Sequence, residues 1–454
     1  MSPHAFSRIS FRAWPRSVAA AIALITFFGT AALTAHAQTR PQVQQRPPSQ
    51  VRPRAAAPVP ASADKPKIRA ITAFINLDRA NYRQQIADAV KMLKYARTVF
   101  DTRGYPVQSI RISTQPFPQY TAGMTAPQAI AFFKDLDALA QTNGFDASIG
   151  PALLNANDDP AQAVLLGEIL RNTKVLNGSI AVAGEDGVRW KAVGAAARLV
   201  KELESTERGQ GNFRFAAISL VPPLTPFYPA SYHTGFGHQF AIALQSANTV
   251  DAAFHGAPDL EAARRRLIDS LGAAAFEVQA LAGRVDRETG WAYSGIDLSP
   301  APLKDVSIGA AMEEITQMPI GESGTLTAAA LITSALRDIA VEKVGYSGLM
   351  LPVLEDARLA QRWSEGRLTL DSLLAYSAVC GTGLDTVPLP GDISEERLAL
   401  IIGDMASLSV KWRKPLTARL MPIAGKGPGD RTEFDDPFLV NAVIQPLAPV
   451  AKTP

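Results

Sequence analysis

Two hydrophobic patterns alternate along most of the chain. Runs rich in β-branched residues, such as 68–77 and 107–114, predict strands. Between them, residues 86–100 place apolar side chains on one face at helical spacing, and Gly104 ends this predicted helix. Strand-like and helix-like segments that follow one another in this way are typical of a largely parallel sheet wrapped by helices. The pattern therefore predicts an α/β fold.

The same patterns continue to the C-terminal part of the chain. They predict strands at 175–183, 213–220, 348–354, 416–423 and 440–444, and helices at about 127–142, 192–205, 259–283, 324–342 and 394–410. Asp392 and Glu395 have the spacing of a capping box at the start of the last helix. Because no linker is evident after residue 67, we expect residues 68–454 to form a single large α/β domain.

The first 37 residues have the composition of a secretory signal peptide. Three arginines precede an apolar stretch at 18–33, and Ala35-His36-Ala37 supplies the small residues that a signal peptidase requires. Cleavage before Gln38 would release a periplasmic or secreted protein without a membrane span. The alternative is an uncleaved N-terminal anchor helix.

Residues 38–67 are dominated by proline, glutamine and arginine. Such a segment has too little apolar surface to offset its ordering entropy, and its prolines favour an extended chain. We expect a disordered spacer, whose arginines offer an alternative role in contacting anionic cell-wall or lipid groups.

The distribution of charge argues against nucleic-acid binding. The whole chain has a formal net charge of +3, yet residues 1–37 contribute three positive charges and residues 38–67 contribute five, which leaves about −5 on the remainder. A nucleic-acid-binding domain is expected to be basic. The partner favoured by the sequence is instead a small polar or anionic ligand, and oligomerisation remains open.

Several glycine-rich blocks are distinctive. They are Tyr376–Asp392 (YSAVCGTGLDTVPLPGD), Leu420–Asp430 (LMPIAGKGPGD), Pro226–His233 (PFYPASYH) and the Tyr293–Asp297 segment (YSGID). Together they resemble the uncharacterised prokaryotic family known as domain of unknown function 711, over about residues 68–444.

This resemblance implies a fold similar to that of glycyl radical enzymes: a barrel-like arrangement of largely parallel strands around a central loop. It implies little about activity, because fold does not fix function. Glycyl radical enzymes have a C-terminal Arg-Val-x-Gly-Tyr segment and commonly a cysteine pair, whereas residues 434–454 contain no such segment and Cys380 is the single cysteine. Radical chemistry is therefore not expected.

Three residues are candidates for catalysis. Cys380 precedes a Gly-Thr-Gly loop whose amides suit an oxyanion, and His233 is a candidate base for it. Asp385 follows the same loop and is a candidate general base. The alternatives are a buried structural thiol for Cys380, a hydrogen-bonding pocket residue for His233 and a turn cap for Asp385.

Three further residues are candidates for substrate binding. Asp297 lies in a polar loop, and Lys426 and Asp430 lie in a glycine-rich loop that suits an anion but is not a P-loop. An Asx turn at Asp297 and a tight turn at 425–430 are the alternatives. No metal or cofactor site is predicted from the spacing of the histidines.

We expect these loops to converge on one pocket. Three functions then remain open: an enzyme of the hydrolase or lyase type, a ligand-binding module without catalysis, and an envelope-associated structural protein.

Overall fold

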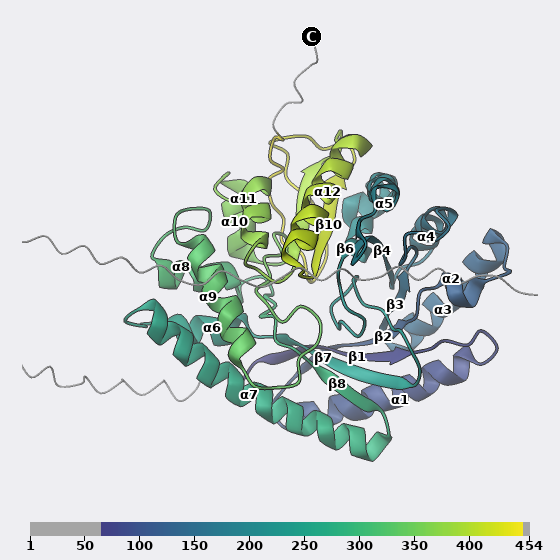
Figure 1. The fold of residues 1–454 in the computed structure, drawn as a ribbon, viewed down its shortest axis with the longest axis horizontal. Helices are drawn as coiled ribbons and strands as arrows, with labels where there is room; N and C mark the ends of the chain where they lie inside the picture. The colour runs from purple at the N-terminus through teal and green to yellow at the C-terminus, as the bar shows by residue number, and fades with distance from the viewer. Residues whose placement is uncertain (1–64, 448–454) are drawn as a thin grey trace, which may run out of the picture. The chain divides into compact units, whose positions relative to one another are not determined.

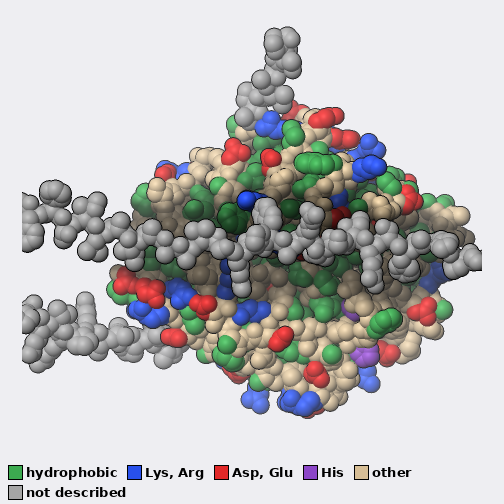
Figure 2. Space-filling model, in the orientation of Figure 1, with side chains coloured by type: hydrophobic (Ala, Val, Ile, Leu, Met, Phe, Trp, Pro, Cys, Tyr) green, Lys and Arg blue, Asp and Glu red, His purple; other side chains and the backbone are tan. Residues whose placement is uncertain are grey.

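The computed structural model of the protein describes residues 65–447, which are drawn as a ribbon in Figure 1 and as coloured spheres in Figure 2. The described residues all belong to one compact unit. The signal peptide expected at 1–37 and nearly all of the spacer expected at 38–67 lie outside the described residues. Within the described part, no helix combines the length and apolar character needed to cross a bilayer.

A ten-stranded sheet forms the centre of the described structure. Its strands are β1 (Lys67–Ile75), β2 (Val107–Thr114), β3 (Asp146–Pro151), β4 (Leu176–Gly184), β5 (Gly187–Val188), β6 (Phe215–Ser219), β7 (His238–Gln245), β8 (Ala292–Asp297), β9 (Gly383–Pro390) and β10 (Leu416–Ile423). They are arranged in the order β8-β7-β1-β2-β3-β4-β6-β10-β9, with β5 beside β4. Six of the nine pairings are parallel, which confirms the predicted α/β class with a mostly parallel sheet.

The finer prediction of a barrel is not confirmed. The strands at the two ends of the order, β8 and β9, are not paired with each other among the described residues. Closure of the sheet and a glycyl-radical-enzyme-like arrangement are therefore not shown.

Helices cover the outer side of the curved sheet (Figure 1). They are α1 (Tyr82–Asp101), α2 (Pro118–Thr121), α3 (Ala126–Asn143), α4 (Ala161–Arg171), α5 (Trp190–Leu203), α6 (Ala247–Phe254), α7 (Leu260–Thr289), α8 (Ile308–Thr316), α9 (Thr325–Asp338), α10 (Ala357–Ser364), α11 (Leu370–Ser377) and α12 (Glu395–Trp412), with a 3₁₀ segment at Thr206–Arg214. The apolar face predicted for 86–100 is buried in α1, as expected for an amphipathic helix on a sheet.

The two faces of the sheet differ in chemistry. In β2, Ile112 packs into the main hydrophobic core, whereas the neighbouring Ser113 points to the opposite, inner face. There the hydroxyl oxygens of Ser113 and Ser231 are 2.5 Å apart, and Ser148 of β3 donates to the carbonyl of Ser231 at 2.7 Å. The segment 222–233 is thus held against the inner face by small polar side chains.

A second irregular segment, residues 342–353, connects the two edges of the sheet. At one end the amide of Ile296 in β8 donates to the carbonyl of Glu342 at 2.9 Å. At the other end the amide of Val353 donates to the carbonyl of Asp385 in β9 at 3.0 Å. This segment therefore extends from β8 to β9, and we refer to it as the bridging segment.

Two predicted strands are wrong. Residues 348–354 belong mostly to the bridging segment, and 440–444 lie in an irregular C-terminal stretch; each contributes to a single isolated bridge rather than to a ladder. The last predicted helix is present, but its cap differs: Ser394, rather than Asp392, accepts a hydrogen bond from the first turn, and the helix begins at Glu395.

Candidate functional site

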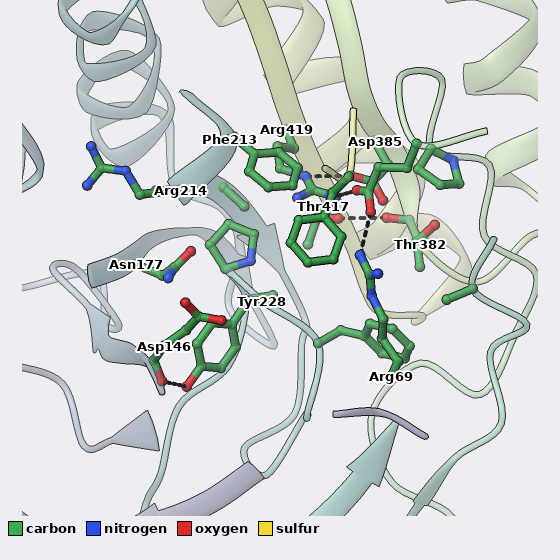
Figure 3. Close-up of a pocket in the computed structure, with 18 of the residues that line it drawn as sticks. Arg69, Asp146, Asn177, Phe213, Arg214, Tyr228, Thr382, Asp385, Thr417 and Arg419 are labelled. Carbon is green, nitrogen blue, oxygen red and sulfur yellow. Dashed lines mark hydrogen bonds and ion pairs between the residues drawn. The ribbon is translucent and has the colours of Figure 1, made fainter. Parts of the chain in front are cut away.

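A cavity of about 230 Å³ lies on the inner side of the sheet, where several strands begin (Figure 3). Asp146 is the first residue of β3, Asn177 is the second residue of β4, and Arg214 immediately precedes β6. Asp385 of β9 and Arg419 of β10 line the opposite wall. The cavity is therefore formed by strand ends that are far apart in the sequence.

Buried ion pairs form one wall of this cavity. Arg419 donates through Nε to Oδ1 of Asp385 at 2.7 Å and through Nη2 to Glu355. Arg69 of β1 donates to the other oxygen of Glu355 at 2.9 Å. All four side chains are at most 10% exposed, so each charge depends on its partners rather than on water.

The pKa values in this wall reflect burial and pairing. Burial raises the pKa of the Asp385 carboxyl, and the charge of Arg419 opposes that rise. Burial lowers the pKa of Arg69 to about 10, with Glu355 opposing. For Arg419, burial is outweighed by Asp385 and Glu355, which raise the pKa of the guanidinium. The two arginines and the two carboxylates of this wall thus neutralise one another.

Arg111 of β2 has a different environment. Its guanidinium carbon lies 4.7 Å from the ring centroid of Tyr228, and its Nη1 makes one long contact of 3.4 Å with the carbonyl of Pro226. Its buried Nε has no hydrogen-bond partner among residues 65–447. Burial lowers the pKa of Arg111, and Asp146 opposes this. Arg111 therefore faces the cavity with unused donors.

Asp146 lies beside Arg111, because these two residues are register partners in the parallel pair of β2 and β3. Figure 3 shows its carboxylate between Asn177 and Tyr228. Within the described part of the chain the carboxylate has neither a hydrogen-bond nor an ion-pair partner, and its contact with Arg111 does not reach salt-bridge distance. Burial raises the pKa of Asp146, with Arg111 and Arg69 opposing.

Of the six predicted site residues, Asp385 lines the cavity. Cys380 is close to Asp385 in the sequence and is buried, but it does not line the cavity. Its backbone carbonyl accepts a hydrogen bond from Lys414. His233 is buried, with Nε2 2.7 Å from Oε1 of Gln239, and burial lowers its pKa. The structure therefore does not bring His233 and Cys380 into the cavity with Asp385.

The three predicted binding residues also lie outside the lining. Asp297 accepts hydrogen bonds from the hydroxyl of Ser299 at 2.6 Å and the amide of Tyr346 at 2.8 Å. Lys426 forms an ion pair with Glu433 at 3.1 Å, and Asp430 closes its turn by accepting from the amide of Gly427 at 2.7 Å. Asp297 nevertheless acts on the cavity wall indirectly, because the Tyr346 that it holds is a lining residue.

Sequence reasoning missed the arginines of the site. Arg69, Arg111 and Arg419 each interrupt an otherwise strand-like run (IRAIT, SIRIS, TARLM). A charged residue within a buried strand needs a partner or a ligand, so this pattern was the available signal. Among residues 65–447, no group of three or more His, Cys, Asp or Glu side chains is arranged to hold a metal ion.

Comparison with known proteins places the chain in a family. A family model described as "Uncharacterised ACR (DUF711)" matches residues 61–436. A "UPF0210 protein" of Pyrobaculum arsenaticum is 33% identical over 80% of this chain and 86% of its own length. Similar proteins from Methanopyrus kandleri and Oenococcus oeni are 31% and 27% identical, over 81% and 82% of this chain and 88% and 86% of theirs. The chain therefore belongs to the uncharacterised DUF711 family, as the glycine-rich blocks of its sequence indicated.

Proposed function

We propose that the protein binds a small anionic metabolite in the arginine-lined cavity, as a non-radical enzyme of the hydrolase or lyase type. The observation that supports this is Arg111, a guanidinium that faces the cavity without an anionic partner at hydrogen-bonding distance. A guanidinium pairs best with a carboxylate or phosphate, which it can contact through two N–H groups.

The neighbouring ion pairs explain why Arg111 would be the anchor. Arg69 and Arg419 are already engaged with Glu355 and Asp385. At Arg111 an incoming anion has no resident carboxylate to displace, whereas Arg214, which also lines the cavity with an unpartnered Nε, lies 3.4 Å from Glu207. The cavity of about 230 Å³ limits the ligand to a small metabolite.

Calorimetric titration of the purified protein with succinate, inorganic phosphate and sulfate would test this proposal. We expect at least one of these anions to bind, and Arg111→Gln to weaken that binding by about tenfold or more. Arg111→Lys should restore only part of it, because lysine keeps the charge and loses the planar fork. Arg198→Gln is the matched control, since Arg198 is 63% exposed on α5. Equal binding by Arg111→Gln would refute the proposal, and so would a wild type that binds no small carboxylate, phosphate or sulfate.

The catalytic part of the proposal has its own test. A ligand that binds and is converted identifies an enzyme, whereas a ligand recovered unchanged after prolonged incubation identifies a binding module.

Export of the protein is also a proposal, and it is supported by the sequence of residues 1–37 alone. N-terminal sequencing of protein recovered from cell fractions would test it. We expect a mature N-terminus at Gln38 in the periplasm or medium; an intact Met1 in the cytoplasm would contradict it.

A further inference from the structure

The cavity contains five acidic lining residues, and Asp146 differs from the other four. Asp385 and Glu355 are paired with arginines, as described above. Glu207 lies 3.4 Å from Arg214, and Asp436 accepts hydrogen bonds from Gln210 and from the amide of Phe438. Asp146 is thus the one lining carboxylate for which residues 65–447 supply no hydrogen-bond or ion-pair partner.

The position of Asp146 adds a second observation. In the register of β2 and β3 it is the direct neighbour of Arg111, and both side chains line the same cavity. Two opposite charges on adjacent strands would ordinarily pair. Here an unused donor and an unused acceptor lie side by side and each faces the cavity.

From this juxtaposition we propose that the ligand carries a carboxylate and, on a neighbouring carbon, a hydrogen-bond donor: an amino acid or a hydroxy acid. The carboxylate accepts from Arg111, and the adjacent ammonium or hydroxyl group donates to the carboxylate of Asp146. This inference rests on the proposed function, because it requires that an anion bind at Arg111, and it names the specificity residue of the same site.

Charged groups around Asp146 agree with this assignment. Arg111 on β2 and Arg69 on β1 both lower the pKa of the Asp146 carboxyl and so favour its charged form. The hydroxyl of Tyr228, in segment 222–233, donates to the backbone carbonyl of Asp146 at 3.4 Å. Since that hydroxyl also donates to the carbonyl of Ile112 at 2.7 Å, it is committed to the backbone. The carboxylate of Asp146 therefore remains available to a ligand.

Three probes of matched size separate the possibilities. Succinate has the carboxylates and lacks the donor, malate adds a hydroxyl, and aspartate adds an ammonium group. In calorimetric titrations at pH 7 we expect the wild type to bind malate or aspartate about tenfold or more tightly than succinate, because a ligand without the donor would cover the Asp146 carboxylate and leave it unpaired.

Two variants then show what Asp146 recognises. Asp146→Ala should remove the preference over succinate altogether. Asp146→Asn keeps an acceptor and loses the charge, so it should retain a preference for malate while abolishing one for aspartate. Both variants should fold, since the side chain has no partner to lose, and circular dichroism checks this. Asp404→Asn, at an exposed position on α12, is the control.

The outcomes distinguish the two levels of the proposal. If succinate binds in an Arg111-dependent way and neither malate nor aspartate binds more tightly, this inference is wrong and the anion site stands. If a preference exists but survives in Asp146→Ala, the inference is also wrong. If succinate, malate, aspartate and phosphate all fail to bind the wild type, the proposed function is wrong and this inference is wrong with it.

Discussion

Glu355→Gln should destabilise the protein strongly, because this one carboxylate supports two buried arginines. Arg419 would keep its 2.7 Å contact with Asp385. Arg69 would keep only a 3.3 Å contact with Gln108 and its stacking on Phe438, so its charge would be left largely uncompensated. Removing one partner from a buried ion pair costs about 3–5 kcal/mol, which is the loss we expect in the free energy of unfolding.

Denaturation by guanidinium chloride at pH 7, followed by circular dichroism, would measure this loss. Glu322→Gln is the matched control: Glu322 pairs with Arg367 at 2.8 Å, but both side chains are 45% exposed, so the expected change is about 0–1 kcal/mol. A loss below about 1 kcal/mol for Glu355→Gln, equal to that of the control, would show that water or rearrangement compensates Arg69. The account of the cavity wall as a charge-paired unit would then be wrong.

Three further predictions concern other parts of the site. Gly345→Ala should destabilise the fold by more than the about 1–2 kcal/mol expected for a residue in the left-handed region, because φ is +66° and the added Cβ atom would lie 2.2 Å from Oδ2 of Asp297. Gly425→Ala is the control in the same denaturation assay: its φ is +75° and no atom lies within 4 Å of the added Cβ, so it should show the conformational cost alone. Asp146→Asn should be more stable than the wild type at pH 7. Because folding raises the pKa of Asp146, ionisation of this carboxyl costs stability once the pH exceeds its pKa in the unfolded chain. The stability gained by Asp146→Asn should therefore disappear below about pH 4 in a series of thermal melts. A gain in stability that does not vary with pH would contradict this prediction. Cys380→Ala should leave anion affinity unchanged in the titrations, because the buried thiol is not part of the cavity lining; loss of binding would show instead that Cys380 contributes to the anion site.

Much of the fold could be predicted because local patterns determine it. Patterns among neighbouring residues predict four of the strands and two of the helices: β1, β2, β4, β10, α1 and α12. Their predicted positions are confirmed within a few residues. β3 (DASIGP) and β8 (AYSGID) were missed because each is short and contains glycine, which weakens a strand pattern.

The site could be predicted only in part, since its contacts depend on sheet order. Asp385 was identified from its glycine-flanked position. Its partner Arg419 is 34 residues away, and Glu355 is 286 residues from Arg69. Such pairs follow from which strands are neighbours, and a single sequence does not contain that order. The lone arginine within each strand pattern was the local sign that a distant partner or ligand must exist.

The bridging segment also affects how the sheet can meet other chains. The edge strand of an open sheet exposes unpaired amide and carbonyl groups, which invite pairing with a strand from another molecule. Here residues 342–353 occupy backbone positions on β8 at one end and on β9 at the other. A strand that joined either edge at these positions would have to displace this segment, which also carries Tyr346 and Met350, two of the side chains that line the cavity. The same stretch of chain therefore occupies part of each sheet edge and part of the cavity wall.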